Sequence, residues 1–188
     1  MELSDWAGDH ARRLLSPLGR RWRHAETVAN RARSLASRLV PEDGDVLVAA
    51  AYLHDIGYAP EVTVTGFHPL DGARHLRALG RHRLAGLVAH HTGARYEARL
   101  RGLQEELAEF EDEASLVSLA LAYCDLTTGP SGERMTPDQR LLDVEARYGD
   151  DSPVTGSLRA GWSELMDAIG QVEALLDGKL PAVTAQPR

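Results

Sequence analysis

The stretch that most constrains this chain is residues 47–58, which read LVAAAYLHDIGY. Residues 46–53 are almost all apolar or small and contain no helix breaker, which predicts a helix buried on every side. His54 and Asp55 follow in its last turn, and Gly57 stands where a C-cap glycine is expected. Burying an imidazole and a carboxylate is costly unless they are paired, and a metal ion binds both. We therefore expect other helices to supply further ligands.

The composition is that of an ordinary globular protein. Its 188 residues, 43% hydrophobic and 26% charged, suffice for one domain with a core. No apolar run approaches the roughly 20 residues of a membrane span, and residues 1–10 lack a signal-peptide pattern. The single cysteine, Cys124, fits a reducing compartment, and its apolar neighbours favour a buried thiol over a nucleophile. We expect a cytoplasmic protein with no membrane partner.

The net charge bears on the partners of the chain. A formal charge of −7 argues against a large nucleic-acid interface, because such interfaces are basic. We therefore expect no nucleic-acid partner. A local basic pocket is compatible with this charge.

Helical periodicity covers most of the chain and predicts a single all-α domain over residues 1–178, followed by a disordered tail at 179–188. The expected helices are residues 4–15, 20–39, 47–56, 68–79, 83–93, 114–126, 136–149 and 157–176. Thr136 and Gln139 have capping-box spacing. The last helix carries an apolar stripe, which packing against the bundle or against a second subunit in a homodimer would explain equally.

Two of these helices turn histidines toward the core. His24 lines up with the apolar residues of its helix, so it faces inward, where a hydrogen-bonded core histidine is the simpler explanation. In the 83–93 helix, periodicity puts His91 on the buried stripe and His90 at its border. Each histidine alone is weak evidence for a metal site.

The remaining candidates lie at helix ends. His68 opens its helix in front of a proline, and Asp125 is an acidic residue near the end of the apolar 114–126 helix. Asp125 thus repeats the design of residues 47–58, a buried helix that ends in a carboxylate. Together the inward histidines and carboxylates of five segments indicate a metal site. The candidate ligands are His24, His54, Asp55, His68, His90, His91 and Asp125.

This order of residues resembles the HD-domain superfamily of metal-dependent phosphohydrolases over residues 20–128. The resemblance implies an HD-type helical bundle in which His24, His54, Asp55 and Asp125 hold one metal ion. The stretch HPLDGA from His68, with its later His-Thr, is similar to members with two metals, including bacterial dinucleoside-tetraphosphate hydrolases. In those members Asp55 would bridge the ions, and His68 and either histidine of the 90–91 pair would complete the second site.

The resemblance also implies an activity. It implies hydrolysis of a nucleotide or other small phosphoester by a metal-bound hydroxide, with His54 and Asp55 as the central catalytic residues and no covalent intermediate. One or two divalent ions (Fe, Mn, Zn, Ni, Co or Mg) would be the cofactor. Tyr58 stands where HD-GYP phosphodiesterases have a lysine, so cyclic-dinucleotide hydrolysis is not expected. Tyr58, Arg95 and Arg99 are the candidate contacts to a small phosphorylated substrate.

Two other functions stay open. The same ligand set resembles HD-type di-iron oxygenases that act on small polar substrates, since histidine and carboxylate also suit iron. A binding or regulatory module with a vestigial site is the third hypothesis, and an intact ligand set argues against it. The sequence names neither the substrate nor the metal.

Overall fold

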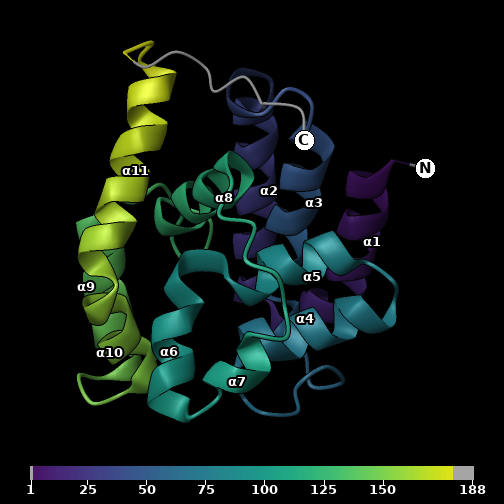
Figure 1. The fold of residues 1–188 in the computed structure, drawn as a ribbon, viewed down its shortest axis with the longest axis vertical. Coiled ribbons are helices and arrows are strands. Elements are labelled where there is room, and N and C mark those ends of the chain that lie inside the picture. Colours follow the sequence, from purple (N-terminus) through teal and green to yellow (C-terminus); the bar gives the residue numbers. More distant parts are fainter. Residues whose placement is uncertain (1, 180–188) are drawn as a thin grey trace.

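The computed structural model describes residues 2–179, which form eleven α-helices joined by turns and short 3₁₀ segments (Figure 1). The α-helices are α1 (Leu3–Leu15), α2 (Arg20–Leu39), α3 (Gly44–Leu53), α4 (His68–Ala78), α5 (His82–Ala89), α6 (Ala94–Arg101), α7 (Gln104–Leu107), α8 (Leu116–Leu126), α9 (Pro137–Tyr148), α10 (Pro153–Ala160) and α11 (Trp162–Leu176). The all-α prediction is confirmed, because β-structure within residues 2–179 is limited to an isolated bridge between Thr128 and Arg134. Residues 180–188 of the predicted tail lie outside the described residues.

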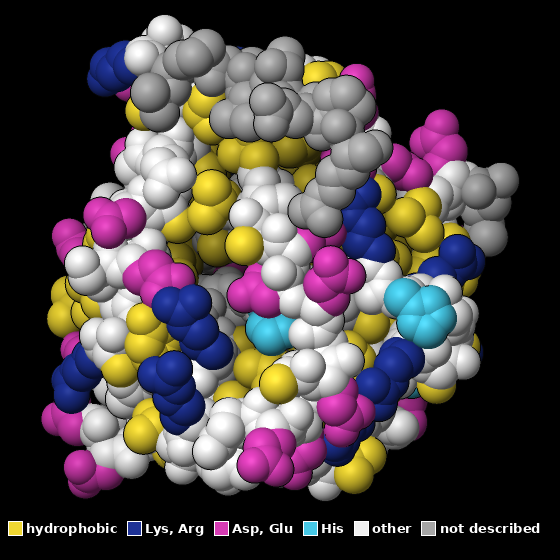
Figure 2. Space-filling model, viewed as in Figure 1, with side chains coloured by type: hydrophobic (Ala, Val, Ile, Leu, Met, Phe, Trp, Pro, Cys, Tyr) yellow, Lys and Arg dark blue, Asp and Glu magenta, His cyan; other side chains and the backbone are white. Residues whose placement is uncertain are grey.

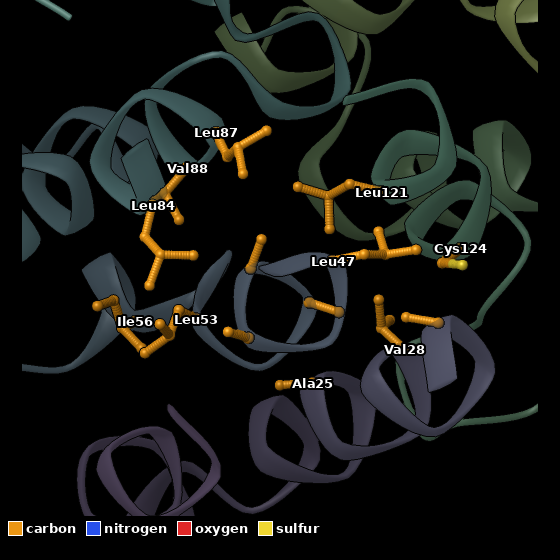
Figure 3. Close-up of a cluster of buried hydrophobic side chains, with 14 of the residues drawn as sticks. Ala25, Val28, Leu47, Leu53, Ile56, Leu84, Leu87, Val88, Leu121 and Cys124 are labelled. Carbon is orange, nitrogen blue, oxygen red and sulfur yellow. The ribbon is translucent and has the colours of Figure 1, made fainter. Parts of the chain in front are cut away.

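Helix α3 lies at the centre of the bundle, as its apolar composition predicts. Helices α1, α2, α5 and α8 all pack against it. Figure 3 shows Leu47 of α3 among side chains of α2 and α8, including Val28, Leu121 and Cys124, whereas Leu84 of α5 lies beside Leu53 and Ile56. Residues 49–51 are alanines with no exposed surface, and their small side chains let neighbouring helices approach closely. The buried apolar surface of these helices, worth about 25 cal/mol per Å², drives the packing.

The end of α3 differs from the sequence expectation. The α-helix ends at Leu53 with His54 as its C-cap residue, and a 3₁₀ turn, η2 (Ile56–Tyr58), follows. The prediction that Gly57 is the C-cap glycine is wrong, because it lies inside η2 and does not have a positive φ. A Cβ atom at Gly57 would lie 2.0 Å from the carbonyl oxygen of His68. Glycine is therefore required here for the close approach of two segments that carry candidate ligands.

The C-terminal helix is also divided. Residues 157–176, expected as one helix, belong to α10 and α11, which meet at Gly161. A Cβ at Gly161 would lie 2.7 Å from the ring of Tyr96 on α6, so the break allows α6 and α10 to pack closely. Leu165 and Ile169 of α11 are buried, and α11 packs against α8. Packing within this chain therefore accounts for the apolar stripe.

Helices α9 and α10 pack against each other, and α10 also packs against α6 (Figure 1). Helix α9 begins with the predicted capping box, in which Thr136 and Gln139 each accept a hydrogen bond from the other's backbone N–H. Acidic and basic side chains are interspersed over the face shown in Figure 2. Within residues 2–179, no helix combines the length and the apolar character that crossing a bilayer requires.

Candidate metal centre

Two groups of metal-binding side chains meet where α3 ends. The first group is His24, His54 and Asp55, whose ligand atoms all lie within 4.8 Å of one another. His24 projects from the buried face of α2, and the other two residues come from the turn after α3. All three are at most 4% exposed, so bulk water does not screen their charges.

The second group is Asp55, His68 and His91. The Nε2 atom of His68, at the start of α4, lies 3.5 Å from Asp55 Oδ1 and 3.3 Å from His91 Nε2. Helix α5 ends at Ala89, and His91 opens the 3₁₀ turn η3 (His91–Gly93). Because Asp55 belongs to both groups, its carboxylate is placed where it could bridge two ions.

In three of the four histidines of the ligand groups, a backbone carbonyl group decides which ring nitrogen faces the centre. The Nδ1 atom is bonded to a carbonyl oxygen in His24 (Gly129, 2.9 Å), His54 (Ala51, 2.8 Å) and His91 (Val88, 2.6 Å). A carbonyl oxygen can only accept, so Nδ1 carries the proton and Nε2 of a neutral ring presents its lone pair to the centre. Hydrogen bonds of this kind orient metal-binding histidines in proteins.

Two histidine nitrogens at the centre have unfavourable surroundings in the absence of a cation. The Nε2 atom of His54 is buried and has no hydrogen-bond partner among residues 2–179, which costs on the order of 1–3 kcal/mol. The Nε2 atom of His24 lies 3.0 Å from Asp125 Oδ1, and a neutral ring in the tautomer above would direct its lone pair at that oxygen. A metal ion would satisfy both nitrogens, so these residues fit a bound divalent ion.

The charge states also suit a metal. Burial lowers the pKa of His54 and of His68, so both imidazoles are neutral near pH 7. Burial by itself would raise the pKa of Asp55 and of Asp125, but nearby histidines and arginines outweigh it and hold both pKa values below the usual carboxyl range. Neutral imidazoles and ionised carboxylates are the forms that bind divalent transition metals.

Asp125, at the end of α8, is held from two sides. Its Oδ1 atom faces His24, and its Oδ2 atom accepts a hydrogen bond of 2.6 Å from the hydroxyl of Thr92. Thr92 has a φ of 48° and a ψ of 44°, a left-handed conformation that a β-branched residue rarely adopts. Such strain costs on the order of 1–3 kcal/mol and is most often found at functional sites.

A buried carboxylate fixes the loop that leads into His68. Asp71 is 1% exposed and accepts hydrogen bonds of 3.0 Å from the backbone N–H groups of Val64, Thr65 and Gly66. These bonds hold the loop against the first turn of α4. Asp71 therefore positions a candidate ligand although it is not itself in either ligand group.

A cavity of about 90 Å³ opens onto the second ligand group. Asp55, His68 and His91 line one part of it, and side chains of α9 and α10, including Val144 and Leu158, line another. The charged and hydrogen-bonding side chains that complete its lining are Arg21, Tyr58, Thr92, Glu97, Asp125, Arg140, Arg147, Tyr148 and Ser157.

Arg21 is the cation nearest to Asp55 in this cavity. One guanidinium nitrogen lies 3.0 Å from Asp55 Oδ2, and another donates a hydrogen bond of 2.7 Å to the hydroxyl of Tyr148. The guanidinium carbon lies 3.5 Å from the centre of the Tyr58 ring, which in turn stacks on the ring of His68. Arg21 is thus held on three sides next to the metal centre.

Three residues selected from the sequence lie elsewhere. The Nε2 atom of His90 is bonded to the carbonyl oxygen of Phe110 at 2.9 Å, so the structure brings His91 and not His90 to the ligand groups. Arg95 forms an exposed ion pair with Glu164, and neither Arg95 nor Arg99 lines the cavity. Their position gives no support to the substrate contacts expected of them, whereas Tyr58 does line the cavity.

Sequence reasoning missed Arg21, Arg140 and Thr92. Arg21 precedes His24 by three residues, and this spacing places the two side chains on one face of a helix, a signal that was present. Arg140 precedes the buried Val144 by four residues, a spacing that places Arg140 on the buried face of its helix. For Thr92 no comparable signal exists, because its role depends on a left-handed backbone that only the fold imposes.

Comparison with known proteins agrees with this geometry. A family model described as HD domain matches residues 21–143, which is more than half of the chain. The matched region contains every member of both ligand groups. Neither the curated proteins nor the solved structures yielded a significant match.

Proposed function

Since this chain belongs to the HD-domain family of metal-dependent hydrolases, we propose that it hydrolyses a nucleotide or another small phosphoester. The observation that carries the proposal is the shared carboxylate of Asp55, which joins two ligand groups at the base of a cavity with three arginines in its lining. Phosphoryl transfer requires positive charge around the phosphoryl oxygens, and metal ions and guanidinium groups supply it. The substrate would be a small anionic molecule.

His24, His54 and Asp55 would hold one divalent ion, and Asp55, His68 and His91 a second. Asp125 would complete the first site, because its Oδ1 atom lies 3.0 Å from His24 Nε2 and 3.9 Å from His54 Nε2. When bound, the ions would supply a water molecule of lowered pKa as the nucleophile and neutralise charge on the phosphoryl group. Arg21 would bind and orient a phosphoryl oxygen, because its guanidinium already borders the cavity. Its contacts with Tyr58 and Tyr148 restrict its motion, so little reorganisation is needed when substrate binds.

The single thiol gives no support to a covalent mechanism. Cys124 is completely buried in α8, and burial raises the pKa of its thiol to about 12. It is therefore protonated near neutral pH and inaccessible to a substrate. This agrees with direct attack of water on phosphorus.

The first test is turnover of a panel of phosphomonoesters and nucleotides by the metal-loaded protein under anaerobic conditions. We expect phosphate release, with one ¹⁸O atom from labelled water entering the phosphate in a single turnover. Asp55→Ala should abolish both stoichiometric metal binding and turnover, because it removes a ligand of both groups. Asp9→Ala, which removes an exposed carboxylate on α1, is the matched control and should keep both.

Two results would contradict the proposal. Wild-type metal content and turnover in Asp55→Ala would show that the ligand groups are not the active centre. Oxygen consumption by the iron-loaded protein, without phosphate release under anaerobic conditions, would instead indicate an oxygenase.

A further inference from the structure

We propose that the substrate carries a second phosphate group and that this group binds a small arginine-lined pocket beside the metal centre. A second cavity of about 50 Å³ is lined by Arg20, Arg21, His24, Pro130, Arg140 and Arg147. The inference rests on the phosphoester hydrolysis proposed above. It adds that the substrate is a diphosphate, a bisphosphate or a longer phosphate chain.

The two cavities share part of their walls. Arg21, Arg140 and Arg147 line both the larger cavity at the metal centre and this second pocket. One guanidinium group has several N–H donors, so it can contact neighbouring phosphates at the same time. A phosphate in the second pocket would therefore be adjacent to one at the metal centre.

The charge of the pocket favours an anion. Four of the side chains that line it are arginines, and no carboxylate is among the described residues in its lining. Arg140 and Arg147 share Asp143 as an ion-pair partner, at 3.2 and 2.6 Å. This concentration of positive charge stands out in a chain whose formal charge is −7.

Metal binding would strengthen this preference. Arg21 lies 3.0 Å from Asp55, and Arg140 lies 3.6 Å from Asp125, so each cation is compensated by a carboxylate of the metal centre. Divalent ions at the centre would offset the negative charge of those carboxylates. Arg21 would then lack compensation, and Arg140 and Arg147 would have only the shared carboxylate of Asp143, so an incoming anion would supply the missing negative charge.

The size of the pocket limits what it can hold. Its volume of about 50 Å³ is smaller than the roughly 90 Å³ of the cavity at the metal centre. Its lining offers four guanidinium groups and, among the described residues, no Phe, Tyr or Trp ring on which a nucleobase could stack, so it suits a phosphate. The pocket therefore distinguishes substrates by their phosphate number and not by a base.

The test compares two probes that the enzyme cannot hydrolyse, methylphosphonate and methylenediphosphonate. Binding to the full chain is measured by calorimetry in a buffer that holds free Mn²⁺ constant, so that the centre stays loaded. We expect the diphosphonate to bind about tenfold more tightly or better, which corresponds to one added charge-assisted contact. Arg20→Gln should reduce this preference to about threefold or less without changing the affinity for methylphosphonate, because Arg20 lines the second pocket and not the larger cavity.

Arg23→Gln is the matched control, since it removes the same charge from α2 at an exposed residue outside both linings. It should keep the wild-type preference. Arg147→Gln, on α9, should also reduce the preference. The same loss in variants of two different helices would show that it does not arise from a folding defect in one of them. Equal affinity of the two probes in the wild type would contradict the proposal that the second pocket binds a phosphate. An equal loss of the preference for the diphosphonate in Arg20→Gln and Arg23→Gln would contradict it too. Failure of both probes to bind would contradict phosphoester hydrolysis itself, and the inference with it.

Discussion

Thr92 combines a strained backbone with a short hydrogen bond to a candidate metal ligand. Its hydroxyl bonds Asp125 Oδ2, which leaves Oδ1 directed at His24 and His54. A left-handed conformation is unfavourable for threonine, so the surrounding fold must impose it. Thr92 is therefore a positioning residue, because it acts on the metal centre through Asp125.

Replacing Thr92 separates the hydrogen bond from the backbone strain. Thr92→Val keeps a β-branched side chain of similar size and removes the hydroxyl, so metal affinity should fall by about 10- to 100-fold. Thr92→Ser keeps the hydroxyl and should bind metal nearly as the wild type does. Calorimetric titration of Mn²⁺ into chelator-treated protein measures both. Equal metal affinity in the two variants would show that the hydroxyl does not support the centre.

At the scale of elements, α1 and α4 meet through a pair of histidines outside the metal centre. His10 Nε2 of α1 lies 2.8 Å from His75 Nε2 of α4. Arg13 can only donate its 3.0 Å hydrogen bond to His10 Nδ1, so His10 is neutral and its Nε2–H donates to His75. The ring of Trp6 stacks on His10 from the same helix. This contact depends on both histidines being uncharged.

The contact should make stability sensitive to acid. Burial, followed by the nearby His75 and Arg13, lowers the pKa of His10 from 6.5 to about 4 in the folded chain. Between these values the unfolded chain binds more protons, so the free energy of unfolding falls as the pH falls from 6.5 toward 4. Melting temperatures measured from pH 7 to pH 5 should therefore decrease less steeply in His10→Gln than in the wild type.

His82→Gln is the control for this comparison. It replaces an exposed histidine at the start of α5 and should leave the wild-type pH dependence unchanged. If the melting temperatures of His10→Gln and the wild type fall in parallel over this pH range, the histidine pair does not contribute to the pH dependence of stability.

For the whole molecule, the apolar core and the metal centre are adjacent but distinct. The core is formed around α3 by apolar side chains of α1, α2, α5 and α8, none of which requires a ligand. The polar side chains gather at one end of α3, where His54 Nε2 has no partner among the described residues. The helices should consequently form without metal, and metal should add stability to an already folded bundle.

Removal of metal tests this separation. Chelator treatment should leave the helical circular-dichroism spectrum intact and lower the melting temperature by roughly 5–10 °C. This estimate combines about 2.7 kcal/mol from an ion present at 100 times its Kd with a shift of about 2–4 °C per kcal/mol. Restoring Mn²⁺ should restore the melting temperature. Loss of the helical spectrum with chelator, or an unchanged melting temperature, would contradict the prediction that metal stabilises an already folded bundle.

The sequence by itself determined the class of fold and most of the candidate centre. The all-apolar stretch at 46–53 required a central helix, because a helix without a polar face must be buried, and the His54-Asp55 pair at its end required a partner. Periodicity also turned His24 and His91 inward. These inferences succeeded because they depend on local spacing and burial alone.

The tertiary structure decided what lies around those ligands. The need for glycine at position 57 depends on the approach of the His68 backbone, which belongs to another segment. The strained Thr92 likewise has its hydroxyl partner, Asp125, 33 residues away. The arginines that border the cavity come from α2 and α9, and only packing brings these helices together. Local patterns specify which residues must be buried together, but the shape and charge of a cavity arise from contacts between distant segments.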